Sequence, residues 1–224
     1  MHITFLENCG LYLQSHGQGL LVDAPNREKT LFDGVPEETV AAMAAGEPPY
    51  DVLAGLVFTH KHSDHYDKKR VRLLTDSRPA LTVFAPNGAT PPEGELDIGT
   101  FHVRYFTVPH SGKEFVSDYH RTLLISDGEV QLYVSGDSVW DRALHERILD
   151  GVALTAAVWN PNFVSQPEGR ALLRLAPRNF INHYPIRSEE AFGIGKKCKT
   201  SFARYADELQ TATLIDHLPM TADI

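Results

Sequence analysis

The sequence predicts an α/β (α+β) fold in which two β-sheets pack face to face with helices outside, a four-layer αββα sandwich. Its predicted elements run in the order strands, crossover helix, strands, helix, strand, helix, which suits this layering. The chain has 224 residues, of which 42% are hydrophobic, so it can bury a sizeable core within the size range of one domain. With no internal repeat or domain linker in view, we expect one domain over residues 1–224.

The N-terminal third alternates short apolar runs with turn residues, which predicts an antiparallel meander. Its three strands are expected at Ile3–Leu6, Gly10–Leu13 and Gly19–Val22. A short helix, a buried strand and an exposed, charged helix should follow. Their expected bounds are Glu37–Ala45, Asp51–Thr59 and Asp64–Leu74.

Strands dominate the middle of the chain, and helices become more frequent toward its end. The Asp127-Gly128 pair supplies a hairpin turn between two of the strands. The expected strands are Ala80–Ala85, Phe101–Val108, Arg121–Ser126, Val130–Ser135, Val152–Trp159 and Asn179–His183. The expected helices are Arg142–Leu149, Gly169–Leu175 and Ser188–Thr211, the last interrupted near Gly193 and Gly195.

Charge and composition exclude several classes of partner. The formal net charge of −8 disfavours nucleic acid, because phosphate binding relies on clustered Lys and Arg. No apolar run approaches the roughly 18 residues of a spanning helix, and Met1–Leu6 begins like a strand without a charged signal region. We therefore expect a cytoplasmic protein without a membrane partner, with Cys9 and Cys198 as free thiols and homo-oligomerisation left open.

A histidine-rich turn is the strongest functional feature. Residues His60-Lys61-His62-Ser63-Asp64-His65 follow an apolar run and bring three imidazoles and one carboxylate onto a single turn of chain. Imidazole and carboxylate ligands suit zinc, iron or manganese, and the lack of cysteine argues against a purely structural site. The turn therefore predicts a metal-containing active centre.

Three later residues have metal-ligand chemistry at the ends of predicted strands. They are His110 in Val-Pro-His-Ser-Gly, Asp137 in Ser-Gly-Asp-Ser and His183 in Asn-His-Tyr-Pro. A centre with two metal ions needs about seven or eight ligand positions, more than one turn can supply. These residues are candidates for the remainder.

In this order the motifs resemble the metallo-β-lactamase superfamily, whose signature is Thr-His-x-His-x-Asp-His, then a His, a Gly-Asp and a final His. The resemblance implies two mixed sheets flanked by helices and two divalent metal ions, with zinc expected and manganese or iron allowed. It places His60, His62 and His110 on one ion and Asp64, His65 and His183 on the other, with Asp137 bridging both. Asp23 would orient the metal-binding turn from outside.

One ligand position has two candidates. His110 and His120 each lie near a predicted strand, and His110 is favoured because it follows Pro109 at the end of the Phe101–Val108 strand, as in the small-lactonase branch. His120 is instead a candidate for protonating the leaving group. A His110→Ala variant that kept full metal occupancy would contradict this assignment.

The resemblance implies hydrolysis by a hydroxide held between two ions, with Asp64 also aiming that hydroxide. Because Asp137 stands where many true β-lactamases have cysteine, the pattern is closer to lactonases, glyoxalase II and tRNase Z. We expect a small-molecule ester or lactone substrate, contacted by Asn160, Tyr184 and Arg187 from loops after strand ends. The alternatives are a phosphodiesterase or nuclease of the tRNase Z type and a non-hydrolytic metal-binding sensor.

Overall fold

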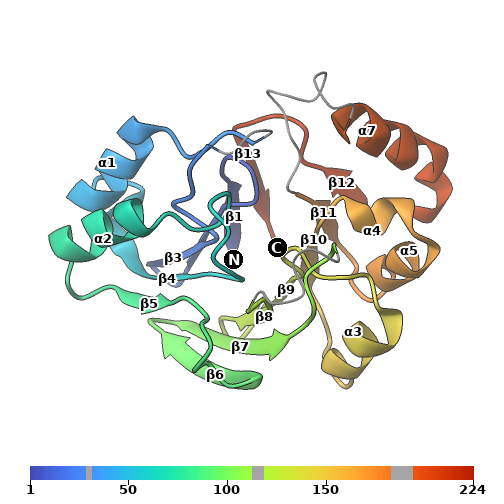
Figure 1. The fold of residues 1–224 in the computed structure, drawn as a ribbon, viewed down its shortest axis with the longest axis horizontal. Helices are drawn as coiled ribbons and strands as arrows, with labels where there is room; N and C mark the ends of the chain where they lie inside the picture. Colours follow the sequence, from blue (N-terminus) through green and yellow to red (C-terminus); the bar gives the residue numbers. More distant parts are fainter. Residues whose placement is uncertain (29–31, 113–118, 183–193) are drawn as a thin grey trace.

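The computed structural model describes residues 1–28, 32–112, 119–182 and 194–224, and it contains two mixed β-sheets that face each other (Figure 1). The first sheet runs antiparallel from β13 to β3 and parallel from β3 to β5. Its spatial order is β13 (Met220–Asp223), β1 (His2–Phe5), β2 (Leu11–Ser15), β3 (Gln18–Val22), β4 (Leu53–Val57) and β5 (Thr82–Phe84).

The second sheet is parallel from β12 to β9 and antiparallel from β9 to β6. Its spatial order is β12 (Ala212–Leu214), β11 (Asn179–Ile181), β10 (Ala156–Trp159), β9 (Gln131–Val134), β8 (Arg121–Ser126), β7 (Phe101–Thr107) and β6 (Glu93–Ile98). The predicted antiparallel meander at the N-terminus and the predicted β8 strand are both confirmed.

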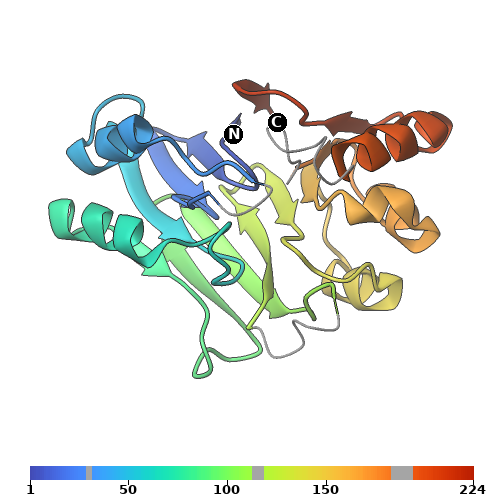
Figure 2. The same cartoon turned by 45° about the horizontal axis from the view of Figure 1, so that its top comes forward.

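Helices cover the outer face of each sheet (Figures 1 and 2). The first sheet carries α1 (Glu37–Ala45) and α2 (Lys68–Ser77), with the 3-10 turn η1 (Tyr50–Val52) before β4. The second carries α3 (Arg142–Ile148), α4 (Asn162–Ser165), α5 (Pro167–Leu173) and α7 (Ile194–Arg204), followed by η3 (Ala206–Glu208). Among the described residues, no helix has the length and apolar character needed to cross a membrane.

Alternation along the strands explains why the molecule has four layers. Leu20 and Val22 of β3 point into the core between the sheets, whereas Leu21 points into the core under α1 and α2. Likewise Leu123 faces the central core and Leu124 faces the core under α3, α5 and α7. Because successive strand side chains point to opposite faces, each sheet can bury both of its faces. The predicted αββα sandwich is thereby confirmed.

Several element bounds differ from the expectation. The helix expected from Asp64 begins at Lys68, because the Asp67 carboxylate accepts hydrogen bonds from the backbone N–H groups of Lys69 and Arg70. Strand β6 was not expected, because acidic residues occupy every second position of this edge strand and leave no apolar run in the sequence. The C-terminal helix runs through Gly195 and ends at Arg204, short of the expected Thr211, and Ala212 begins the unexpected strand β12.

The topology gathers the candidate site at one end of the sandwich. Strands β3 and β4 are parallel neighbours, so Asp23 and Thr59, which follow them, lie at the same edge of the first sheet. Parallel β9 and β10 do the same for Asp137 and Asn160 in the second sheet. A hydrogen bond from Arg121 N to Thr59 O at 2.8 Å joins the two sheets there.

Candidate metal centre

Asp23 anchors the histidine-rich turn. It follows β3 with a φ of 49°, a left-handed conformation that Asp tolerates better than most residues, and it is 1% exposed. Its Oδ1 accepts the Thr59 N–H at 2.7 Å, and its Oδ2 accepts the Thr59 hydroxyl at 2.8 Å. The same Oδ2 lies 3.0 Å from Nδ1 of His65. One carboxylate therefore holds both ends of the turn.

These contacts fix which ring nitrogen faces the centre. The Nδ1–H of His65 donates to Asp23, and we assign the Nδ1–H of His60 to the Thr59 oxygen at 3.0 Å, since the Thr59 hydroxyl proton is already committed to Asp23. His110 donates Nδ1–H to Ser111 O at 2.6 Å. All three rings consequently turn Nε2 toward the centre, the nitrogen through which each would bind a metal ion.

The imidazoles converge into one cluster. Donor atoms of His60, His62 and His110 all lie within 4.8 Å of one another, and so do those of His60, His65 and Asp137. Nε2 of His60 and Nδ1 of His62 are 3.0 Å apart. This grouping matches the set that the sequence assigns to the first ion, although ligation itself stays a prediction.

Asp137 lies between the two groups. Its Oδ2 is 3.3 Å from Nε2 of His65 and 3.5 Å from Nε2 of His110. The preceding Gly136 has a φ of 54°, and a Cβ there would lie 2.6 Å from Nε2 of His120 and 2.9 Å from Cβ of Thr59. Gly136 is therefore required by backbone conformation and by space, and the Asp that follows it points its carboxylate between His65 and His110.

Burial and neighbouring charge shift the histidines in opposite directions. Burial and the adjacent His65 and His120 rings lower the pKa of His60 well below its usual value. Burial also acts to lower the pKa of His65, but the surrounding Cys9, Asp137 and Asp23 outweigh it and raise that pKa well above the usual value. The metal-free centre thus combines a neutral ring with one held protonated between two carboxylates.

The connection between β1 and β2 contacts the histidine-rich turn through Asn8 and Cys9. Asn8 Nδ2 and Cys9 Sγ both approach the Asp64 carbonyl oxygen, the thiol at 3.3 Å, and Cys9 Sγ is 3.2 Å from Nδ1 of His65. Burial raises the pKa of the Cys9 thiol to about 12, against the opposing effect of the adjacent His65. The sequence did not predict these contacts of Asn8 and Cys9, nor the link through Thr59, although Thr59 belongs to the recognised motif.

His120 differs from the other rings at the centre. Its Nδ1–H donates to Val108 O at 3.0 Å, and its Nε2 accepts the Asp137 backbone N–H at 2.9 Å. Burial lowers its pKa to about 3, so the ring is neutral at pH 7. Both nitrogens are used inside the protein, and this geometry argues against the predicted role of His120 as a proton donor.

The remaining predicted residues divide into three cases. Asp64 is buried, at 4% exposure, and its carbonyl contacts are those given above. Asn160, predicted to contact substrate, donates its amide to Oδ1 of Asp137 at 2.7 Å instead of pointing outward. His183, Tyr184 and Arg187 lie outside the described residues.

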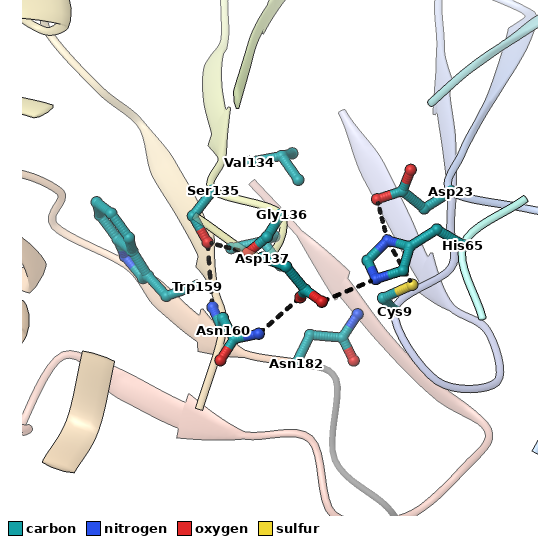
Figure 3. A pocket seen from close by; sticks show the side chains of 11 residues that line it. Cys9, Asp23, His65, Val134, Ser135, Gly136, Asp137, Trp159, Asn160 and Asn182 are labelled. Atoms are coloured by element: carbon teal, nitrogen blue, oxygen red, sulfur yellow. Dashed lines mark hydrogen bonds and ion pairs between the residues drawn. The ribbon is translucent and has the colours of Figure 1, made fainter. Parts of the chain in front are cut away.

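A small cavity separates the two halves of the centre (Figure 3). Cys9, Asp23 and His65 approach it from the first sheet, and Asp137, Asn160 and Asn182 approach it from the second. Its volume is about 20 Å³, room for about one water molecule. The side chains that line this cavity therefore lie close to one another.

Comparison with known proteins rests on structure. The sequence matches no family model and no curated protein. A possible metal-dependent hydrolase from Veillonella parvula superimposes with a TM-score of 0.71 at 13% identity, covering 100% of this chain and 99% of that one. The metallo-β-lactamase fold protein YhfI from Bacillus subtilis superimposes with a TM-score of 0.63 at 15% identity, covering 99% of this chain and 98% of that one. This chain has the metallo-β-lactamase fold.

A third similar structure with this fold is an isothiocyanate hydrolase from Delia radicum gut bacteria, with a TM-score of 0.68 at 15% identity, covering 100% of this chain and 99% of that one. At identities this low, the structural similarity establishes the metallo-β-lactamase fold alone. The chemistry has to be argued from the residues of this chain. Those residues place a His and Asp cluster where the sequence predicts a metal centre.

Proposed function

We propose that the protein is a metal-dependent hydrolase that binds two divalent metal ions, zinc being expected, and cleaves a small-molecule ester or lactone. The observation that carries the proposal is the position of Asp137, whose Oδ2 lies between His65 and His110. A carboxylate shared by two groups of imidazoles suits a pair of ions better than a single ion.

The residues present fit such ions. His60, His62 and His110 would hold one ion, and His65 and Asp64 the other, together with His183 if the motif is followed. Nitrogen and oxygen donors of this kind suit zinc, manganese or iron. Three of the rings have their Nδ1–H held by Thr59, Asp23 and Ser111, so their Nε2 atoms already face the centre. His65 would release its Nε2 proton to solvent when an ion binds.

The ions would supply Lewis acidity, lowering the pKa of a bound water to about 7 and polarising the scissile oxygen. The protein's own contribution is positioning. Asp23 orients His65 directly and His60 through the Thr59 hydroxyl, and the packed surroundings keep bulk water from the buried face of the centre. We infer that Asp64 also accepts a hydrogen bond from the attacking water and so aims its lone pair.

The substrate is proposed to be a small molecule. A net charge of −8 opposes binding to nucleic acid, and the Asp at position 137 follows the lactonase-like pattern. Contacts from Tyr184 and Arg187 stay predictions, whereas the amide of Asn160 has a different partner.

The test combines elemental analysis with a substrate panel. We expect purified protein to hold about two metal equivalents and to cleave members of a lactone and thioester panel, with activity lost after chelation and restored by zinc. The panel should include bis(p-nitrophenyl) phosphate and an isothiocyanate, because one similar structure is an isothiocyanate hydrolase.

Two variants make the test specific. His60→Ala should lower activity by more than about 100-fold, since even partners outside the ligand set contribute about 10–100-fold. His102→Ala is the matched control, because His102 pairs with Asp97 on the outer surface. Cleavage of the phosphodiester alone would favour a phosphodiesterase, and two bound ions without any cleavage would favour a sensor. Binding of fewer than two metal equivalents by wild type would contradict the proposal.

A further inference from the structure

Asn160 stands beside the proposed bridging carboxylate because of strand pairing. Strands β9 and β10 are parallel neighbours, with Val134 opposite Val158, so the residues that follow them emerge side by side. Asp137 and Asn160 are each 8% exposed. Figure 3 shows the two side chains meeting at the edge of the cavity, on the side opposite His65.

The orientation of the Asn160 amide is determined by its neighbours. Its backbone N–H donates to Ser135 Oγ at 3.1 Å, which fixes the main chain. Its Oδ1 accepts the N–H of Asn162 at 2.9 Å, at the start of α4. Because only the oxygen can accept that bond, the NH₂ group must point the other way, toward Asp137. Nδ2 then lies 2.7 Å from Oδ1 of Asp137.

The two carboxylate oxygens of Asp137 face different groups. Oδ1 receives the Asn160 amide, while Oδ2 faces Nε2 of His65 and of His110. An amide donor holds the carboxylate without adding a positive charge beside it. A Lys or Arg donor would add such a charge. Asp137 thus presents one defined oxygen, Oδ2, to the centre.

We propose that Asn160 is a positioning residue that reserves Oδ2 of Asp137 for bridging the two metal ions, an inference that rests on the proposed function. It replaces the expected role of Asn160 in contacting substrate. Removing the amide frees the carboxylate to rotate or to offer both oxygens to one ion, so the pair of ions loses its shared ligand.

The experiment compares wild type with Asn160→Leu, which keeps the number of side-chain heavy atoms and the branching at Cγ and removes the donor. Zinc affinity is measured by competition with a chromophoric chelator, metal stoichiometry by elemental analysis, and site geometry by the absorption spectrum of the cobalt-substituted protein. We expect the weaker zinc equivalent to bind about 10–100-fold less tightly and the cobalt spectrum to change.

Asn160→Leu also removes the acceptor at the start of α4, so a control for helix capping is needed. Asp141→Ala removes the acceptor that Asp141 offers to Leu144 N at the start of α3, without touching Asp137. Its melting temperature should fall while its zinc affinity and cobalt spectrum stay those of wild type. If Asn160→Leu fails to fold, Asn160→Ala takes its place.

The outcomes separate the two proposals. An Asn160 variant that binds two zinc ions with wild-type affinity and an unchanged cobalt spectrum overturns the positioning role alone. Wild-type protein that binds fewer than two ions overturns the dinuclear function and the positioning role with it. Loss of affinity in the Asn160 variant, with Asp141→Ala unaffected, supports the inference.

Discussion

At the scale of single residues, ring contacts separate two histidines that the sequence leaves in competition. His110 has its Nδ1–H held by the Ser111 carbonyl, and its Nε2 lies 3.5 Å from Oδ2 of Asp137. His120 has both nitrogens engaged, with Val108 O and with Asp137 N. A ligand must offer a lone pair to the ion, so His110 suits this position and His120 suits a structural role.

This difference gives a direct prediction. His110→Ala should lose about one metal equivalent with a modest effect on folding. His120→Ala should lower the free energy of unfolding by about 2–4 kcal/mol, since it removes two buried hydrogen bonds and leaves a cavity, yet its folded fraction should keep both ions. Elemental analysis and urea unfolding of both variants check this, and the reverse pattern would exchange the roles of the two residues.

Residue types and spacing could predict the ligand set, but the direction of a side chain could not be predicted from them. Asp23 was expected to orient the turn, and it does contact Thr59 and His65. Asn160 was placed correctly after a strand, but the sequence does not reveal that its oxygen accepts from Asn162 and so turns its NH₂ toward Asp137. Contacts of this kind depend on neighbours that are distant in sequence.

At the scale of elements, the start of α2 shows how a cap overrides helix-forming composition. The charged run after Asp64 favours a helix, but Asp67 accepts from two backbone N–H groups and sets the start at Lys68. The four residues before the helix stay in the turn, where Asp64 and His65 are needed. The cap therefore keeps the helix from extending into the segment that carries Asp64 and His65.

Replacing Asp67 with Ala should cost about 1 kcal/mol, because the two N–H groups lose their acceptor. In a chain of this size the melting temperature should fall by about 2–4 °C. Metal content should not change, since the turn is also held by Asp23 and by the Asp64 carbonyl contacts. Differential scanning calorimetry with elemental analysis tests this, and a loss of metal from Asp67→Ala would show that the cap and the centre are coupled.

Strands with a clear apolar pattern were predictable, whereas strands that depend on distant partners were not. β8, with five buried residues in succession, appears with its expected bounds. β13 has only half-buried and exposed residues, and it exists because β1 pairs with it. The sequence offers no local signal for such a strand, because its stabilising hydrogen bonds come from the other end of the chain.

At the scale of the whole molecule, a buried histidine links stability to pH. His145 of α3 lies in the core under the second sheet, where its Nδ1 is 2.7 Å from the Tyr133 hydroxyl and its Nε2 is 2.8 Å from Val139 O. Burial lowers its pKa below the usual 6.5. The unfolded chain therefore takes up a proton at this position before the folded protein does.

Lowering the pH therefore destabilises the folded protein through His145. The contribution of neutral, buried His145 to the free energy of unfolding is complete above about pH 6.5. It is lost as the pH falls toward the lower pKa of the folded state, by up to about 1.4 kcal/mol per pH unit. His145→Gln cannot titrate, so its stability should fall less steeply between pH 7 and pH 5. Urea unfolding of the metal-free proteins measures this difference, and parallel curves would rule out the linkage.

The pairing of β13 with β1 also bears on how the protein is made. His2 lies opposite Asp223, and the Met1 amino group donates to Ile224 O across a separation of 223 positions. On the ribosome β1 emerges long before β13, and its outer edge stays uncovered until residues 220–223 have followed it out. Exposed strand edges can recruit other chains, so the interval of synthesis is when this sheet is most vulnerable to aggregation.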